Sequence, residues 1–192
     1  LENKNLDEIK NSLPESPQEK LKKLIKKYKL SKYDAETLTK NLDIAEFFEK
    51  VAEKVNPKFA ISWITVELKR VLNYTKKEFH EVDIKLEHFI ELLQLIEKKE
   101  ITELKAKEIL NKFIPQSFSP KSLAKENAKI SDEKEIEKLA KRVISENKKA
   151  VEDYTSGKKE SINFLIGQVM KLSNKRADFK TAKEILEEIL SR

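Results

Sequence analysis

Basic side chains are the residues of this sequence that are best placed to do chemistry, and the chemistry they offer is binding to an anionic surface. They gather around one predicted helix in the stretch 150–178, with Lys158 and Lys159 before the helix and Lys171, Lys175 and Arg176 at its end. Cations at the C-terminal end of a helix are also explained by the helix dipole, whereas cations before its N-terminus are not. Two interpretations stay open: phosphate contacts with a nucleic acid and a protein-interaction surface.

Both glycines of the chain, Gly157 and Gly167, lie in the same stretch. Gly157 follows a short periodic segment and predicts the end of a helix. Gly167 lies inside the apolar pattern of the next helix, where glycine costs about 1 kcal/mol relative to alanine. This cost indicates that another backbone comes close to Gly167, and we expect packing of a second helix rather than contact with a nucleic acid.

Catalytic and metal-binding residues form no recognisable constellation in the sequence. The chain has no cysteine, and its two histidines, His80 and His88, are better interpreted as exposed polar residues than as zinc ligands. Two glycines are too few for a glycine-rich phosphate loop. We therefore expect no catalytic residue, no metal site and no cofactor in this chain itself.

Charge is abundant but nearly balanced along the chain. Charged residues make up 39% of the sequence, and the net charge is +6. This excess is compatible with a polyanionic partner but does not require one. No apolar run approaches the roughly 18 residues that span a membrane, and no secretory signal is visible, so we expect a cytoplasmic protein without a membrane partner.

Helical periodicity runs along the whole chain, and no segment alternates like a strand, so the sequence predicts an all-α fold. Polar capping residues mark the starts of several predicted helices: Ser16, Ser31, Asn56, Thr102, Asn147 and Asp178. The segment 74–85 reads as either helix or loop. Inside the helices, apolar residues recur every three or four positions, which predicts cores built from one face of each helix.

The candidate domain boundary is a Ser-rich stretch between Pro115 and Pro120. We expect a helical domain over residues 15–117 and a tail domain over residues 118–192, each a small helical bundle. Residues 1–14 are polar and irregular, as in a linker from an upstream domain. The chain also begins at Leu1 without an initiator Met, which indicates a fragment of a longer polypeptide.

The back half of the sequence resembles the C-terminal tail of the GatB family. The resemblance is carried by the run Asn-Lys-Lys-Ala-Val-Glu-Asp-Tyr at 147–154, by Gly157-Lys158, and by the run Phe-Leu-Ile-Gly-Gln-Val-Met-Lys at 164–171. GatB is the B subunit of the tRNA-dependent amidotransferase. Its tail is called YqeY-like, and it also occurs as a free-standing protein and at the end of the archaeal protein GatE.

The front half resembles the helical segment that precedes this tail in the family. The matching residues are the run 28–39 and the block Asn56-Pro57-Lys58 followed by Trp63. The resemblance thus covers the chain from about Leu13 onward, and the front segment resembles GatB more than GatE. It implies a helical domain followed by a YqeY-like tail domain, both downstream of a catalytic domain.

The resemblance also implies what the parent protein does. Its catalytic domain uses ATP and Mg²⁺ to activate the carboxylate of misacylated tRNA, which is then amidated with ammonia from a glutaminase subunit. The parent complex would thereby convert Glu-tRNA(Gln) or Asp-tRNA(Asn) into Gln-tRNA(Gln) or Asn-tRNA(Asn). The implied partners are tRNA, the glutaminase subunit, the small subunit and an aminoacyl-tRNA synthetase. None of the family's ATP or metal ligands can be placed on this sequence.

For this chain the resemblance implies tRNA binding, with the tail meeting the outer corner formed by the D and T loops. The positions that match the family's motif are Gly157, Lys158, Gly167, Gln168 and Lys171. Electrostatics adds Lys159, Lys175 and Arg176 as RNA contacts. The stretch 172–176 departs from the family's pattern, which leaves the contact residues open. The alternatives are a module that docks a synthetase or other amidotransferase subunits, the equivalent tail of GatE, and a passive linker bundle.

Overall fold

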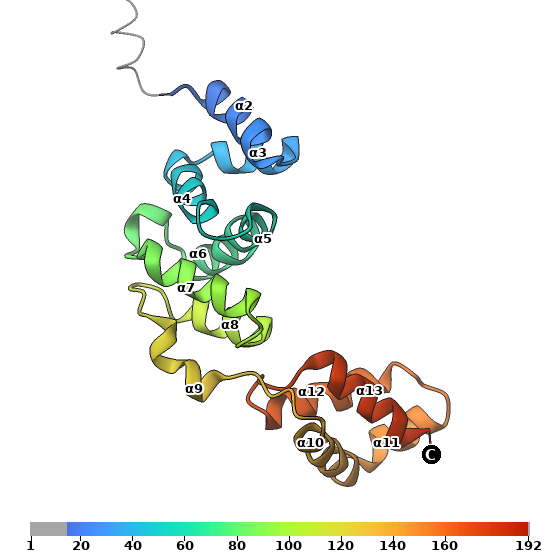
Figure 1. The fold of residues 1–192 in the computed structure, drawn as a ribbon. Helices are drawn as coiled ribbons and strands as arrows, with labels where there is room; N and C mark the ends of the chain where they lie inside the picture. Colours follow the sequence, from blue (N-terminus) through green and yellow to red (C-terminus); the bar gives the residue numbers. More distant parts are fainter. Residues whose placement is uncertain (1–14, 192) are drawn as a thin grey trace, which may run out of the picture. The chain divides into compact units, whose positions relative to one another are not determined.

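The computed structural model describes residues 15–191, and the predicted linker 1–14 lies outside the described residues (Figure 1). Over this range the chain is helical and contains no strand. Two isolated parallel bridges, Asp83 with Gln116 and Ile130 with Ala177, are the β-type pairings within the same range. The all-α class predicted from the periodicity is therefore confirmed. The chain divides into two compact units, one ending at Val82 and one beginning at Asp83.

The first unit is a succession of short helices. Its elements are α2 (Pro17–Tyr28), α3 (Lys32–Thr39), α4 (Leu42–Ala52), α5 (Pro57–Ser62), the π-helical η1 (Trp63–Leu68), α6 (Lys69–Thr75) and the 3₁₀ helix η2 (Phe79–Glu81). Ser16 and Glu19 form a complete capping box at the start of α2, as predicted. Leu24, Leu38 and Phe48 are fully buried, so the unit has a core of its own.

The second unit contains the remaining helices. They are α7 (Leu86–Glu97), α8 (Glu103–Asn111), the 3₁₀ helix η3 (Pro120–Leu123), α9 (Ala124–Asn127), α10 (Glu133–Glu146), α11 (Lys148–Thr155), α12 (Ser161–Leu172) and α13 (Phe179–Leu190). The predicted boundary at 117/118 lies inside this unit and does not coincide with the division at 82/83. An independent tail domain over 118–192 stays a prediction.

The Ser-rich stretch that suggested this boundary is packed against the start of the unit. The N–H of Asp83 donates to the carbonyl of Pro115, and the N–H of Ser117 donates to the carbonyl of Asp83, both at 2.9 Å. The buried Ser117 hydroxyl accepts from the Lys85 N–H at 2.8 Å and lies 2.9 Å from Nδ1 of His88. His88 is therefore half-buried rather than exposed, and composition alone could not reveal these contacts between distant residues.

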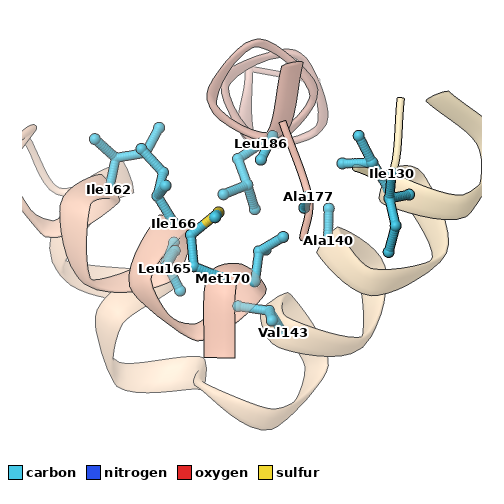
Figure 2. Packing of buried hydrophobic residues seen from close by; sticks show 12 residues of the cluster. Ile130, Ala140, Val143, Ile162, Leu165, Ile166, Met170, Ala177 and Leu186 are labelled. Atoms are coloured by element: carbon cyan, nitrogen blue, oxygen red, sulfur yellow. The ribbon is translucent and has the colours of Figure 1, made fainter. Parts of the chain in front are cut away.

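Helices α10, α12 and α13 enclose the core of the tail, with α11 packed against α12 (Figure 1). Figure 2 shows Ala140 and Val143 of α10, Leu165 and Met170 of α12, and Leu186 of α13 converging on this core. Each belongs to an apolar stripe that the periodicity predicted. Asn147 does not cap α11 as predicted, because its side-chain amide donates to the carbonyl of Val143 at 2.8 Å.

Candidate nucleic-acid interface

Helix α12 turns one face to the core and leaves the opposite face to solvent. Residues spaced three or four apart lie in line on a helix, so its exposed residues form one stripe. We call the set Asn163, Phe164, Gly167 and Lys171 the outer stripe of α12. This stripe contains two of the residues that sequence reasoning selected, Gly167 and Lys171.

Gly167 is exposed in the middle of the outer stripe. A Cβ built on it would meet nothing within 4 Å. The expectation that a second helix of this chain packs there is therefore wrong for the described residues. Its apolar sequence neighbours face the core, whereas Gly167 itself points away from it. The space beside Gly167 is open to a group from outside the chain.

Gly157 lies just after α11 and has a φ of +109°, a left-handed conformation that side-chain-bearing residues rarely adopt. Its N–H donates to the carbonyl of Tyr154 at 3.2 Å, which closes the last turn. The predicted helix end is thus confirmed. Any side chain at this position would be strained by the backbone alone.

Lys158 and Lys159, which follow this turn, have local partners. Nζ of Lys158 lies 3.0 Å from Oδ1 of Asp153, and Nζ of Lys159 lies 4.2 Å from the centroid of the Tyr154 ring. These contacts give both cations local partners, which the helix dipole considered in the sequence does not supply. An exposed ion pair contributes only about 0–1 kcal/mol, so a phosphate group could replace Asp153 with little loss of stability. The Lys158 side chain is 64% exposed and accessible to such a group.

Lys171 lies in the last turn of α12, where a cation also complements the helix dipole. It is exposed, and it forms no ion pair with any residue between 15 and 191. Gln168, one turn before Leu172, is half-buried at the edge of the outer stripe. Of the predicted contacts, Lys171 is the cation most available to a phosphate.

Lys175 and Arg176 belong to the loop between α12 and α13, and both hold this loop in place. Nζ of Lys175 lies 3.4 Å from Oε2 of Glu108, and the Lys175 carbonyl accepts a hydrogen bond from the Thr102 hydroxyl. Nε of Arg176 donates to the carbonyl of Ala128 at 2.8 Å. These cations thus have structural partners within their unit, in addition to any role in RNA binding.

A hollow of about 500 Å³ lies beside this loop, and Lys129 and Asp178 are among its lining residues. Asp178 caps α13 by accepting from the Thr181 N–H at 2.9 Å, as predicted. The hydrogen bond from Lys129, supported by those from Thr181, lowers the pKa of Asp178 to about 2. The Asp178 charge is thus matched by Lys129 and serves the fold.

Sequence reasoning missed Phe164, whose side chain is 52% exposed on the outer stripe. The helical periodicity of the sequence could have found Phe164, because the apolar stripe of α12 contains Ile162, Leu165 and Ile166 and leaves Phe164 on the other face. An aromatic residue off the apolar stripe of its helix is a candidate contact for a partner.

Between residues 15 and 191, no group of three or more His, Asp or Glu side chains is arranged to hold a metal ion. Within the same limits, no helix is both long enough and apolar enough to cross a membrane.

The chain is all-α within its described residues, and its tail bundle has an outer stripe with an exposed glycine and an exposed lysine. Comparison with protein families shows the class to which the chain belongs. Residues 46–190 match the model described as the GatB domain. The chain belongs to this family, so the family predicted from the sequence motifs is confirmed.

The relatives are named as the B subunit of aspartyl/glutamyl-tRNA(Asn/Gln) amidotransferase. The chain is 40% identical to the protein of Methanocaldococcus jannaschii, with 96% of the chain and 41% of that protein covered. It is 40% identical to the protein of Methanothermobacter thermautotrophicus, with 94% and 40% covered, and 38% identical to that of Thermotoga petrophila, with 96% and 39% covered. The chain thus spans about two fifths of the length of these relatives.

Proposed function

We propose that this chain is the tRNA-binding C-terminal region of the B subunit of an aspartyl/glutamyl-tRNA(Asn/Gln) amidotransferase. Family membership and the names of the relatives support this role. The structural observation that carries this proposal is the outer stripe of α12. There the exposed Gly167, with open space beside it, precedes Lys171. Lys171 has no ion-pair partner among residues 15–191. Open space next to a cation is what a phosphate backbone needs in order to come close to a helix.

The predicted contacts would act at the two ends of α12. Lys171 binds phosphate at the C-terminal end, and Lys158 and Lys159 bind phosphate before the N-terminal end. A helix of this length spans roughly 18 Å, so the two ends engage different phosphates of a folded RNA. Gln168 adds a hydrogen bond to a phosphate or a 2′-hydroxyl group. Lys175 and Arg176 contribute positive charge near the Lys171 end.

The chemistry of the parent complex belongs to other parts of it. In this proposal, a catalytic domain with ATP and Mg²⁺ activates Glu-tRNA(Gln) or Asp-tRNA(Asn), and a glutaminase subunit supplies ammonia. The chain described here contributes no catalytic residue and positions the tRNA in the cytoplasm for the other domains. The small subunit and a synthetase remain the further partners that the family resemblance implies.

Salt-dependent tRNA binding tests this function. Removal of one phosphate contact should lower the log–log salt slope of the affinity by roughly 1, so Lys171→Ala and Lys158→Ala should each reduce it by that amount. Lys180→Ala is the matched control, because Lys180 is 85% exposed and is paired with Glu184 on α13. tRNA(Gln), tRNA(Asn) and an unrelated tRNA should be compared at each salt concentration.

Two results would contradict the proposal. One is a wild-type chain that binds none of these tRNAs above background at low salt. The other is an unchanged affinity and salt slope after combining Lys158→Ala with Lys171→Ala. In the second case the basic residues around α12 would be a solvated surface and nothing more.

A further inference from the structure

Phe164 lines a hollow at the opposite end of α12 from Lys175. The hollow has a volume of about 430 Å³ and is bordered by the end of α10, the start of α11 and the start of α12. Its lining residues include Lys148, Lys149, Asp153 and Ser161 together with Phe164. Ligand pockets typically measure about 300–1,000 Å³, so the hollow has room for a flat ring system.

The charge around this hollow is positive once the ion pairs are taken into account. Arg142 lies 2.8 Å from Glu146 and Lys158 lies 3.0 Å from Asp153, so each of these two pairs has no net charge, whichever group its cation contacts. Lys148 and Lys149 are exposed and form no ion pair within residues 15–191. The hollow therefore combines a half-exposed aromatic ring with two cations that have no carboxylate partner in the described range.

The start of α11 adds further complementarity to an anion. Its cap residue, Asn147, makes no side-chain hydrogen bond to the first turn, because its amide donates backwards to Val143. The first backbone N–H groups of a helix have no partner within the helix. The beginning of α11 thus presents donors beside Lys148 and Lys149.

We propose that Phe164 stacks on an unpaired base of the bound tRNA, and that Lys148 and Lys149 hold the phosphate next to that base. The inference rests on the proposed tRNA binding and adds a base contact to the phosphate contacts. Aromatic residues beside cations are the usual means by which proteins hold single-stranded nucleotides. A base within a helix is already stacked, so the hollow selects a loop or another unpaired segment.

Gly167 fits the same arrangement. It lies three residues after Phe164 on the outer stripe, so the two positions are neighbours on the helix surface. The open space at Gly167 allows the sugar-phosphate chain to run along α12 from the stacked base toward Lys171. The stripe then forms one continuous track with an aromatic contact at one end and a cation at the other.

The test compares a tRNA(Gln) transcript with a fully paired RNA duplex of matched length, using the full chain. Phe164→Ala should weaken tRNA binding by about 5- to 150-fold and leave duplex binding unchanged. Its salt slope should equal that of the wild type, because every phosphate contact is kept. Phe164→Trp should keep the tRNA affinity. Lys148→Ala combined with Lys149→Ala should reduce the salt slope by about 0.7, because one phosphate contact with an unpaired strand is lost.

Phe179→Ala is the matched control, because Phe179 and Phe164 are equally exposed, at 52% each. It should bind tRNA as the wild type does. If Phe164→Ala binds tRNA as tightly as Phe179→Ala and the wild type do, the stacking contact does not exist. If Phe164→Ala keeps its RNA affinity but no longer binds the other amidotransferase subunits, the hollow is a protein interface and the inference is overturned.

The two proposals can fail separately in this experiment. If the wild type binds tRNA and Lys171→Ala weakens binding while Phe164→Ala does not, only the stacking inference falls. If the wild type binds no tRNA, the proposed function and the stacking inference fall together. Circular dichroism of each variant checks that the exposed substitutions leave the helices intact.

Discussion

Substitution of Gly167 by alanine should change the stability of the fold and the affinity for tRNA in opposite directions. Its backbone is helical and a Cβ would meet nothing within 4 Å, so Gly167→Ala should raise the free energy of unfolding by about 0.5–1 kcal/mol. If an RNA backbone occupies the space, the same change should weaken tRNA binding. Urea unfolding and tRNA titration of one variant measure both effects.

Gly157→Ala provides the contrasting control for this prediction. With a φ of +109° at residue 157, alanine there is strained, and the variant should be less stable than the wild type. A Gly167→Ala variant that is more stable and binds tRNA with unchanged affinity would show that RNA does not approach this position.

Asp178 should make the tail sensitive to acid. Its pKa is lowered from 3.8 to about 2 in the folded chain, chiefly by the hydrogen bond from Lys129. A depressed pKa stabilises the fold at pH values above 3.8, by about 2 kcal/mol, and this contribution disappears as the pH falls through about 2. Asp178→Asn keeps a capping side chain but lacks the charge.

The measurement for Asp178 is the free energy of unfolding of both proteins between pH 6 and pH 2. The wild type should be more stable at pH 6, and the difference between the two should shrink toward zero at the acid end. A difference that stays constant over this range would mean that the Lys129–Asp178 pair does not stabilise the fold.

At the level of single residues, the sequence predicts which side chains can bind a partner better than it predicts which residues those side chains contact within the fold. Lys171 could be selected because its charge and its position at a helix end are both readable from the sequence. The helix dipole does not account for Lys158 and Lys159, and the structure shows that Asp153 and Tyr154 lie close to them across the Gly157 turn. The direction of the chain through a left-handed turn decides these contacts, and sequence spacing does not show it.

At the level of elements, sequence signals that involve a single helix turn mostly predicted the structure, whereas contacts between residues far apart in the sequence could not be predicted. Ser16, Thr102 and Asp178 cap their helices as predicted, because capping involves only the following turn. Asn147 fails as a cap, since its amide has an alternative partner one turn back. The Ser-rich stretch was predicted to mark a domain boundary, and the pairing of its backbone with Asp83, which is far away in the sequence, is a contact that no local signal shows.

At the level of the whole molecule, the chain divides into two compact units, and we expect each unit to respond separately in unfolding. Leu24 in the first unit and Leu165 in the second are both fully buried. Leu24→Ala should destabilise the first unit and Leu165→Ala the second, each by about 2–5 kcal/mol. Hydrogen exchange measured along the chain separates the two responses.

The expected pattern is faster exchange in α2–α4 after Leu24→Ala and in α10–α13 after Leu165→Ala. Leu172→Ala is the control within α12, because its side chain is 37% exposed and the substitution removes little buried area. Faster exchange along the entire chain in either core variant would show that the units unfold as one.

The packing of the Ser-rich stretch has a consequence for how such chains can exchange parts during evolution. A junction between Gln116 and Ser117 would separate Ser117 from its partners Asp83, Lys85 and His88, and a new neighbour would have to replace those hydrogen bonds. A junction between Val82 and Asp83, or one after Ser117, leaves all of these bonds on one side. Recombined members of this family should therefore have their junctions at one of these two positions rather than between residues 83 and 117.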